Sequence, residues 1–249
     1  MAEKHFYEQK KYTQEYLLPY FQKYIPDFRN KKILEVGCAE GGLLEIMQEL
    51  GIYAVGLEIS EERAVVAVKK NPALKIVVGD IMDPRLAAKL NEKFDMIIMR
   101  EVIEHIPNKD AAFNNLDALL EPNGYLFMSF PPKRSPFAGH QQIGKSVLKA
   151  VPYLHVLPKF FLKATASLMR EESDYVEEIK LHFSTGCTIK EFERQSIKRN
   201  MFPIKKEFFL FRPIYALRFG LPTIKLPNIP FLREYISFGC ETLLKKNHQ

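Results

Sequence analysis

Five short apolar runs, separated by amphipathic stretches, restrict the folds open to the first half of this chain. The runs are ILEV (33–36), YAVGLE (53–58), LKIVVG (74–79), FDMIIM (94–99) and YLFMSF (125–130). Short β-rich runs that alternate with helix-like segments are typical of βαβ units, whose parallel strands share one sheet. The sequence therefore predicts an α/β fold built on these five strands.

Polar and proline residues mark where the intervening helices begin and end. Ser60 is expected to cap a helix with an acidic first turn, and Asn71-Pro72 is expected to end that helix. Asp83-Pro84 is expected to open the next one, with proline at its first position. The spacing of these signals leaves room for one helix after each of the second and third strands.

The alternation of apolar runs and amphipathic stretches ends after residue 130. Residues 131–187 are rich in proline, aromatic and basic residues, which indicates an inserted cap and not further sheet. A helix is predicted over 188–200, and β-like runs follow at 204–211 and 236–244. These last two runs are expected to pair as antiparallel strands across a long apolar connection.

A glycine-rich turn follows the first predicted strand directly. The letters GCAEGG (37–42) lie between ILEV and an amphipathic helix, where small residues allow a close backbone approach to a ligand. Glu58 ends the second strand, and its carboxylate suits the two hydroxyls of a ribose. Asp80 and Ile81 end the third strand, where they suit an adenine ring, although Asp80 is also placed to cap the next segment. In order, these features indicate nucleoside binding.

The same residues resemble the class I S-adenosylmethionine-dependent methyltransferases. The resemblance runs over residues 32–130 and includes ILEVGCAEGG, VGLEIS, VGDIMD, FDMIIMREVIEHIPN and LEPNGYLFMSFP. The EHIP segment and the PNG turn are the most telling, because neither belongs to a dinucleotide-binding fingerprint. The resemblance implies S-adenosylmethionine as cofactor and a Rossmann-like doubly wound sheet, mostly parallel with a C-terminal antiparallel strand pair.

The family pattern also implies a division of the chain and a set of site residues. It implies an N-terminal helical lid at 1–30, a methyltransferase domain at 31–130 and 188–249, and a cap at 131–187 over the acceptor site. The implied cofactor-binding residues are Glu35, Gly37, Ala39, Gly41, Glu58, Ile59, Asp80, Ile81 and Met99. Ala39 stands where the family often has glycine, and its methyl group is acceptable if this residue avoids positive φ.

Methyl transfer from a sulfonium is an in-line displacement that depends mainly on alignment, and it needs a base only when the acceptor loses a proton. His140 and Arg100 are the candidate catalytic residues, and His140 and His182 are candidate acceptor-binding residues. His140 is equally compatible with simply holding the cap together, and His182 with organising the start of the next helix.

Other polar and aromatic residues are more readily explained by structure. His105 is expected to be structural, with Glu104 bracing the turn after the fourth strand, and His155 is expected to be buried and hydrogen-bonded. Tyrosines recur every four or five residues between Tyr7 and Tyr24, which predicts a packed helical stripe. The family resemblance implies that one of them contributes to a lid over the cofactor. The apolar connection at 208–231 suits an acceptor-pocket roof, a membrane surface or a dimer contact.

Composition narrows the function further. Three scattered cysteines exclude a disulfide framework or zinc cluster, so no metal is expected and a cytoplasmic location is favoured. No segment of the sequence has the length of an apolar membrane span. The net charge of +6 is compatible with nucleic acid without requiring it.

These observations rank the possible functions. The leading hypothesis is O-methylation of a small or medium-sized, lipid-like or glycan-like acceptor. Alternatives are methylation of RNA or protein and a non-catalytic cofactor-binding module, and an NAD-linked oxidoreductase ranks last.

Overall fold

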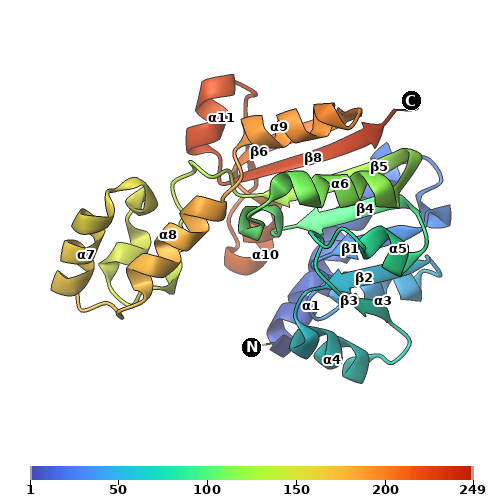
Figure 1. Cartoon of the computed structure of the whole chain (residues 1–249), viewed down its shortest axis with the longest axis horizontal. Coiled ribbons are helices and arrows are strands. Elements are labelled where there is room, and N and C mark those ends of the chain that lie inside the picture. The colour runs from blue at the N-terminus through green and yellow to red at the C-terminus, as the bar shows by residue number, and fades with distance from the viewer. Residues whose placement is uncertain (1, 248–249) are drawn as a thin grey trace.

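The computed structural model describes residues 2–247, in which one eight-stranded sheet forms the centre of the molecule (Figure 1). Its strands are β1 (Ile33–Val36), β2 (Ala54–Glu58), β3 (Lys75–Val78), β4 (Phe94–Arg100), β5 (Leu120–Phe130), β6 (Met201–Phe211), β7 (Ile224–Leu226) and β8 (Gly239–Lys246). Their order across the sheet is β3-β2-β1-β4-β5-β8-β6-β7. The first five pair in parallel, whereas β8 pairs antiparallel with both β5 and β6. The predicted fold class is confirmed, with the short edge strand β7 as an addition.

Helices cover both faces of this sheet and also form the cap. They are α1 (Ala2–Tyr12), α2 (Leu18–Tyr24), α3 (Gly42–Glu49), α4 (Glu61–Lys70), α5 (Leu86–Leu90), α6 (Lys109–Leu119), α7 (Lys159–Leu168), α8 (Tyr175–Thr185), α9 (Ile189–Lys198), α10 (Pro213–Phe219) and α11 (Pro230–Ile236). A π-helical segment, Thr13–Leu17, joins α1 to α2.

Alternate side chains of the central strands enter two separate cores. On β4, Ile97 and Met99 pack in a core that includes side chains of α6 and α9, whereas Met96 and Ile98 pack in one that includes side chains of α2 and α3. Because successive strand side chains point to opposite faces, an apolar run such as FDMIIM is needed to bury a strand from both sides. This burial explains why the sequence signal for the sheet is strong.

The helix starts agree only partly with the sequence prediction. Ser60 caps α4, with its Oγ accepting a hydrogen bond from the Arg63 amide at 3.3 Å. The expectation for Asp83-Pro84 is wrong, because α5 begins at Leu86. The Asp83 carboxylate instead accepts from the Arg85 amide at 2.9 Å, which makes a turn ahead of the helix.

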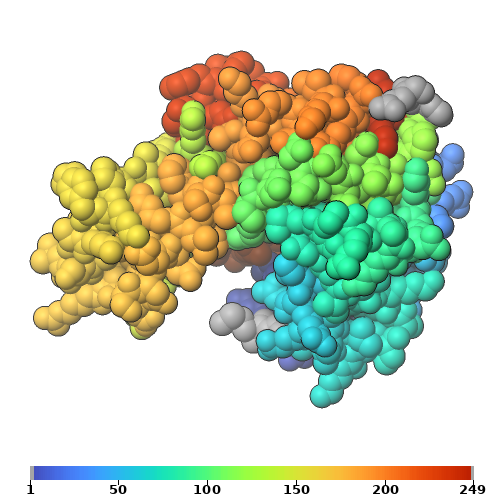
Figure 2. Space-filling model, in the orientation of Figure 1, coloured from blue at the N-terminus to red at the C-terminus, as the bar shows by residue number. Residues whose placement is uncertain are grey.

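Residues 131–187 form a lobe that projects from one end of the sheet (Figure 1) and stands apart in Figure 2, where its surface is yellow. It contains α7, α8 and three short 3₁₀ turns around its own apolar cluster. The members of that cluster are Leu148, Leu154, Leu162, Ala166, Tyr175, Val176 and Ile179. The lobe can therefore hold its shape largely through its own contacts.

His155 is buried in this lobe, as expected, but the expectation that it is hydrogen-bonded is wrong. Neither of its ring nitrogens has a hydrogen-bond partner among the residues described. Burial lowers the pKa of His155 to about 4, so its ring is neutral at physiological pH. A neutral imidazole costs less to bury unpaired than a charged one would.

Candidate functional site

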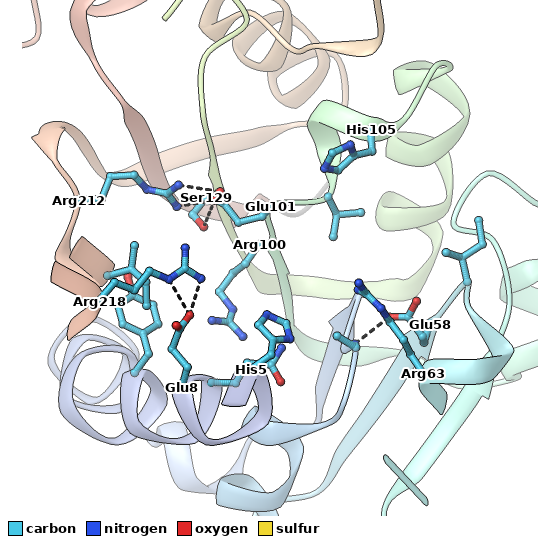
Figure 3. A pocket seen from close by; sticks show the side chains of 17 residues that line it. His5, Glu8, Glu58, Arg63, Arg100, Glu101, His105, Ser129, Arg212 and Arg218 are labelled. Atoms are coloured by element: carbon cyan, nitrogen blue, oxygen red, sulfur yellow. Dashed lines mark hydrogen bonds and ion pairs between the residues drawn. The ribbon is translucent and has the colours of Figure 1, made fainter. Parts of the chain in front are cut away.

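A cavity of about 440 Å³ opens at the carboxyl ends of the central parallel strands, which is where α/β folds usually bind ligands. Its wall comes from the turns after β1, β2 and β4, from α1 and from α10. The lining residues are His5, Glu8, Gln9, Tyr12, Gly37, Ala39, Glu58, Ile59, Arg63, Arg100, Glu101, Val102, His105, Ser129, Arg212, Ile214 and Arg218. Figure 3 shows these side chains around the cavity.

The turn after β1 forms the floor of this cavity and requires unusual backbone angles. Gly37 has a φ of 74°, and a Cβ atom there would lie 2.3 Å from Val102 Cγ2. Gly41 has a φ of 78° and is the N-cap of α3. Ala39 also has a positive φ, 49°, so the condition under which its methyl group costs nothing is not met. The strain at Ala39 is offset by a hydrogen bond from its amide to Glu58 Oε2 at 2.8 Å.

We expect Gly37→Ala to weaken binding of S-adenosylhomocysteine, the demethylated cofactor, at least tenfold. The new methyl group would collide with Val102 and displace the turn that the cofactor must approach. Gly51→Ala is the matched control, since Gly51 has a similar φ of 71° but nothing within 4 Å of an added Cβ. Calorimetric titration of both variants shows whether the loss is specific to the turn at Gly37, and a Gly37→Ala affinity equal to that of Gly51→Ala would contradict this account.

Glu58 joins the turn after β1 to the start of α4. Its two carboxylate oxygens accept hydrogen bonds from the amides of Ala39, at 2.8 Å, and Ser60, at 2.9 Å. A carboxylate offers about four acceptor positions, so capacity remains for two further donors. Because Glu58 also lines the cavity, its free acceptor positions suit two neighbouring hydroxyl groups.

Arg100 and Glu35 form an ion pair beneath the cavity. Arg100 Nη2 donates to Glu35 Oε1 at 2.8 Å, and the Glu35 side chain is only 2% exposed. Burial raises the pKa of Glu35, while the guanidinium of Arg100 opposes that rise. Arg100 lines the cavity but Glu35 does not, so Glu35 acts on the site by holding Arg100 in place.

Four predicted cofactor residues are not among those that line the cavity. Gly41, Ile81 and Met99 are buried, and Asp80 accepts a hydrogen bond from the Met82 amide at 2.8 Å. This hydrogen bond forms a local turn, which agrees with the second role suggested for Asp80, capping of the next segment. The structure gathers the other predicted cofactor residues, apart from Glu35, around the cavity itself: Gly37, Ala39, Glu58 and Ile59.

Both ends of the sequence supply lining residues that the sequence prediction missed. Gln9 Oε1 accepts from the Gly42 amide at 3.1 Å, which fixes α1 against the start of α3. Figure 3 shows two ion pairs, Arg212–Glu101 and Arg218–Glu8, on the side of the cavity away from Glu58. No local motif marks these residues, because their partners are distant in sequence.

Three histidines meet at the edge of the cavity. The His105 ring lies 5.1 Å from that of His140 and 5.2 Å from that of His182, and the last two rings stack at 4.2 Å between centroids. His105 is one of the residues that line the cavity. Burial, with repulsion from His182 and His105, lowers the pKa of His140 to about 4. The imidazole of His140 is therefore neutral at physiological pH.

A protein-family model described as a methyltransferase domain matches residues 6–171. The chain belongs to this methyltransferase family. The enzyme is S-adenosylmethionine-dependent, and the acceptor positions that Glu58 leaves free in the cavity suit the two ribose hydroxyls of that cofactor. Among residues 2–247, no helix combines the length and apolar character needed to cross a bilayer.

Individual relatives agree with this assignment. The methyltransferase is 27% identical over 201 residues to a ubiquinone biosynthesis O-methyltransferase of Actinobacillus pleuropneumoniae serotype 5b, covering 78% of this chain and 79% of that protein. It is 34% identical over 119 residues to the enzyme of the same name from serotype 7, covering 45% of this chain and 50% of the relative. The latter match thus spans half the length of that relative.

Solved structures show a similar fold. The plantazolicin methyltransferase BpumL, determined in complex with a triazolic desmethyl analogue and S-adenosylhomocysteine, superposes with a TM-score of 0.57. Its sequence is 16% identical, and the alignment covers 97% of this chain and 86% of that one. At this identity the similarity concerns the fold alone.

Proposed function

We propose that this methyltransferase methylates an oxygen atom of a small or medium-sized, lipid-like acceptor. The observation that carries the proposal is the similarity to a ubiquinone biosynthesis O-methyltransferase over 78% of the chain. The cap at 131–187 also supports it, because its His140 contacts His105 of the cavity wall, a position that suits a compact acceptor. Three buried free cysteines support a reducing, cytoplasmic location.

The positions of the cavity residues suggest a separate role for each. When bound, S-adenosylmethionine supplies an activated methyl group. Glu58 and the turn at Gly37 hold the nucleoside end, while Arg100, fixed by Glu35, borders the reaction space. Alignment of the acceptor against the methyl group then accounts for most of the rate.

The acceptor would enter from the side of the cap, where the three histidines meet. His140 comes from the cap and His105 from the turn after β4, so their contact joins the cap to the cavity wall. A neutral His140 can accept a hydrogen bond from an acceptor hydroxyl and orient its oxygen. Its pKa of about 4 makes it a weak base, so this imidazole is better suited to orientation than to deprotonation.

The N-terminal segment would close the other side as a lid. Gln9 and Tyr12 of α1 line the cavity, and the Tyr12 and Tyr16 rings stack at 5.2 Å between centroids. Tyr7, in contrast, is 61% exposed and does not take part in that stack. One tyrosine of the predicted stripe, Tyr12, is therefore placed to contribute to the lid.

Methyl transfer to a panel of acceptors tests this function. The full chain would be incubated with methyl-labelled S-adenosylmethionine and, separately, a phenol bearing an isoprenoid tail, an oligosaccharide, total RNA and a protein extract. We expect label on the phenolic oxygen, located by mass spectrometry. Label only in RNA or protein would favour the alternative acceptors, and cofactor binding without any transfer would favour a non-catalytic module.

A further inference from the structure

A buried carboxyl group, that of Glu241 on β8, lies behind the cavity. Glu241 is only 1% exposed, yet its two oxygens accept hydrogen bonds from the hydroxyls of Tyr12, at 3.3 Å, and Tyr16, at 2.6 Å. Its partners across the sheet are Ser129 of β5, which lines the cavity, and Glu207 of β6. Among residues 2–247, neither oxygen of Glu241 is bonded to a lysine or an arginine. The carboxyl group is therefore bonded to tyrosine hydroxyls and not to a cation.

Tyr12 connects this carboxyl group to the cavity. Tyr12 is one of the residues that line the cavity, whereas Glu241 and Tyr16 are not. The Tyr12 hydroxyl donates to Glu241, and its oxygen can still accept a hydrogen bond from a ligand. Burial raises the pKa of Tyr12 well above its ordinary value, and the negative charge of Glu241 adds to that rise. Tyr12 therefore stays protonated, and it can take up a second proton only by giving its own away.

The surroundings of Glu241 leave it able to gain and lose a proton. It is faced by Tyr12 and Tyr16 from the N-terminal helical segment, by Glu207 from β6, and by Arg212 and Glu101 from the residues after β6 and β4. Arg212 pairs with Glu101 (Figure 3), and Lys225 pairs with Glu207, so neither cation neutralises Glu241 directly. Burial raises the pKa of Glu241 to about 7, against the Tyr16 hydrogen bond and the charge of Arg212. A group that titrates near the working pH is well suited to accept a proton in catalysis.

We propose that Tyr12 and Glu241 form a relay that takes the proton from the acceptor hydroxyl during methyl transfer. The relay rests on the proposed function, in which the acceptor is a hydroxyl group. The acceptor hydroxyl gives its proton to the Tyr12 oxygen as Tyr12 gives its own proton to Glu241 Oε1. In the same step the acceptor oxygen bonds to the methyl carbon, and the carbon–sulfur bond breaks with its electron pair left on sulfur. The negative charge of the carboxylate and the positive charge of the sulfonium thus disappear together.

This arrangement separates two tasks between two parts of the chain. His140 has a pKa of about 4, so it is a weak base that suits orientation of the acceptor oxygen. Glu241 is the stronger base, and its burial leaves Tyr12 as the only route to the cavity among the groups bonded to it. After the methylated product leaves, the proton returns through Tyr12 to the solvent that enters the cavity. Glu241 is then ready for another turnover.

Infrared spectroscopy of the full chain tests the proton acceptor without any turnover. A protonated-carboxyl stretching band that is present in the wild type and absent from Glu241→Gln belongs to Glu241. We expect this band to disappear as pH rises through about 7. Its midpoint should rise in Tyr12→Phe and in Tyr16→Phe, because each change removes a hydrogen bond that favours the carboxylate.

A tyrosine elsewhere in the chain provides the matched control for this titration. Tyr53 donates to Glu92 at 3.1 Å, and neither residue lines the cavity, so Tyr53→Phe should leave the midpoint unchanged. An unchanged midpoint in Tyr12→Phe would show that Tyr12 does not act on Glu241 and would overturn the relay. Absence of a titrating Glu241 band between pH 5 and pH 9 would overturn it as well.

Methyl transfer to the isoprenoid phenol measures the relay at work. In the wild type, kcat should increase as pH rises through about 7 and Glu241 loses its proton. Tyr12→Phe and Glu241→Gln should each lower kcat about tenfold or more at pH 8 with little change in KM, since a positioned base contributes at least that much. Tyr16→Phe keeps the route through Tyr12, so it should move the rise in kcat to higher pH without lowering the plateau.

A more acidic acceptor distinguishes lost proton transfer from a structural defect. A nitro-substituted phenol with the same tail releases its proton more readily, so the loss of kcat in Tyr12→Phe and Glu241→Gln should shrink with this acceptor. Equal losses with both phenols would contradict the relay, with circular dichroism confirming that the variants are folded. If the wild type methylates neither phenol, the proposed function fails, whereas the infrared titration still decides whether Glu241 exchanges a proton in contact with Tyr12.

Discussion

Replacing Glu58 with glutamine should weaken S-adenosylhomocysteine binding about 100-fold or more while leaving the protein folded. The carboxylate already accepts from the amides of Ala39 and Ser60, so its remaining acceptor positions face the cavity. Each hydrogen bond to a charged group is worth about 1.5–3 kcal/mol, and two ribose hydroxyls would use two of them. Glutamine takes the charge from both bonds and leaves one acceptor oxygen in place of two, which corresponds to roughly a hundredfold change or more in affinity.

Glutamine sharpens the test because it preserves the shape of the side chain. Its amide nitrogen would face a backbone donor, Ala39 or Ser60, so the variant loses an acceptor as well as the charge. Glu62→Gln is the matched control, because Glu62 is exposed in the first turn of α4. An affinity of Glu58→Gln within threefold of the wild type, measured by calorimetry, would rule out ribose recognition by Glu58.

The sheet could be predicted from the sequence because a strand that is buried on both faces needs a run of consecutive apolar residues, which is recognisable locally. A strand such as β4 must be apolar at consecutive positions, and the run FDMIIM shows that requirement in the sequence. The first residues of the helices are less clear from the sequence. Ser60 caps α4, but Asp83-Pro84 forms a turn in which the next helix has not yet begun.

The cofactor side of the site was likewise predictable where residues follow strand ends. Gly37 directly follows β1, and Glu58 is the last residue of β2. Because β1 and β2 are parallel, both residues lie at the same edge of the sheet. Gln9 and Arg212 reach the same cavity from near the two ends of the chain. Their positions depend on how α1 and α10 pack, which no short sequence pattern records.

A buried carboxyl group behind the site makes stability depend on pH. Glu241, on β8, is 1% exposed and accepts hydrogen bonds from Tyr12 at 3.3 Å and Tyr16 at 2.6 Å. Burial raises the pKa of Glu241 to about 7, although the Tyr16 hydrogen bond and Arg212 oppose that rise. The folded protein therefore holds this proton over a pH range in which the unfolded chain has released it.

The sign of the effect follows from proton linkage. With a folded pKa of about 7 and an ordinary value of 4.5, the native state binds more protons between these limits, so the free energy of unfolding falls as pH rises through them. The loss amounts to about 3 kcal/mol. Glu241→Gln mimics the protonated carboxyl group and still accepts from Tyr16, so it should escape this loss.

We therefore expect the stability of Glu241→Gln relative to the wild type to increase by about 3 kcal/mol between about pH 4.5 and pH 8. Urea unfolding at several pH values measures this difference. Glu3→Gln, at the exposed start of α1, should show no comparable trend. A difference between Glu241→Gln and wild type that stays constant with pH would show that Glu241 is ionised in the folded protein. In that case Tyr12, Tyr16 and Arg212 would outweigh the effect of burial.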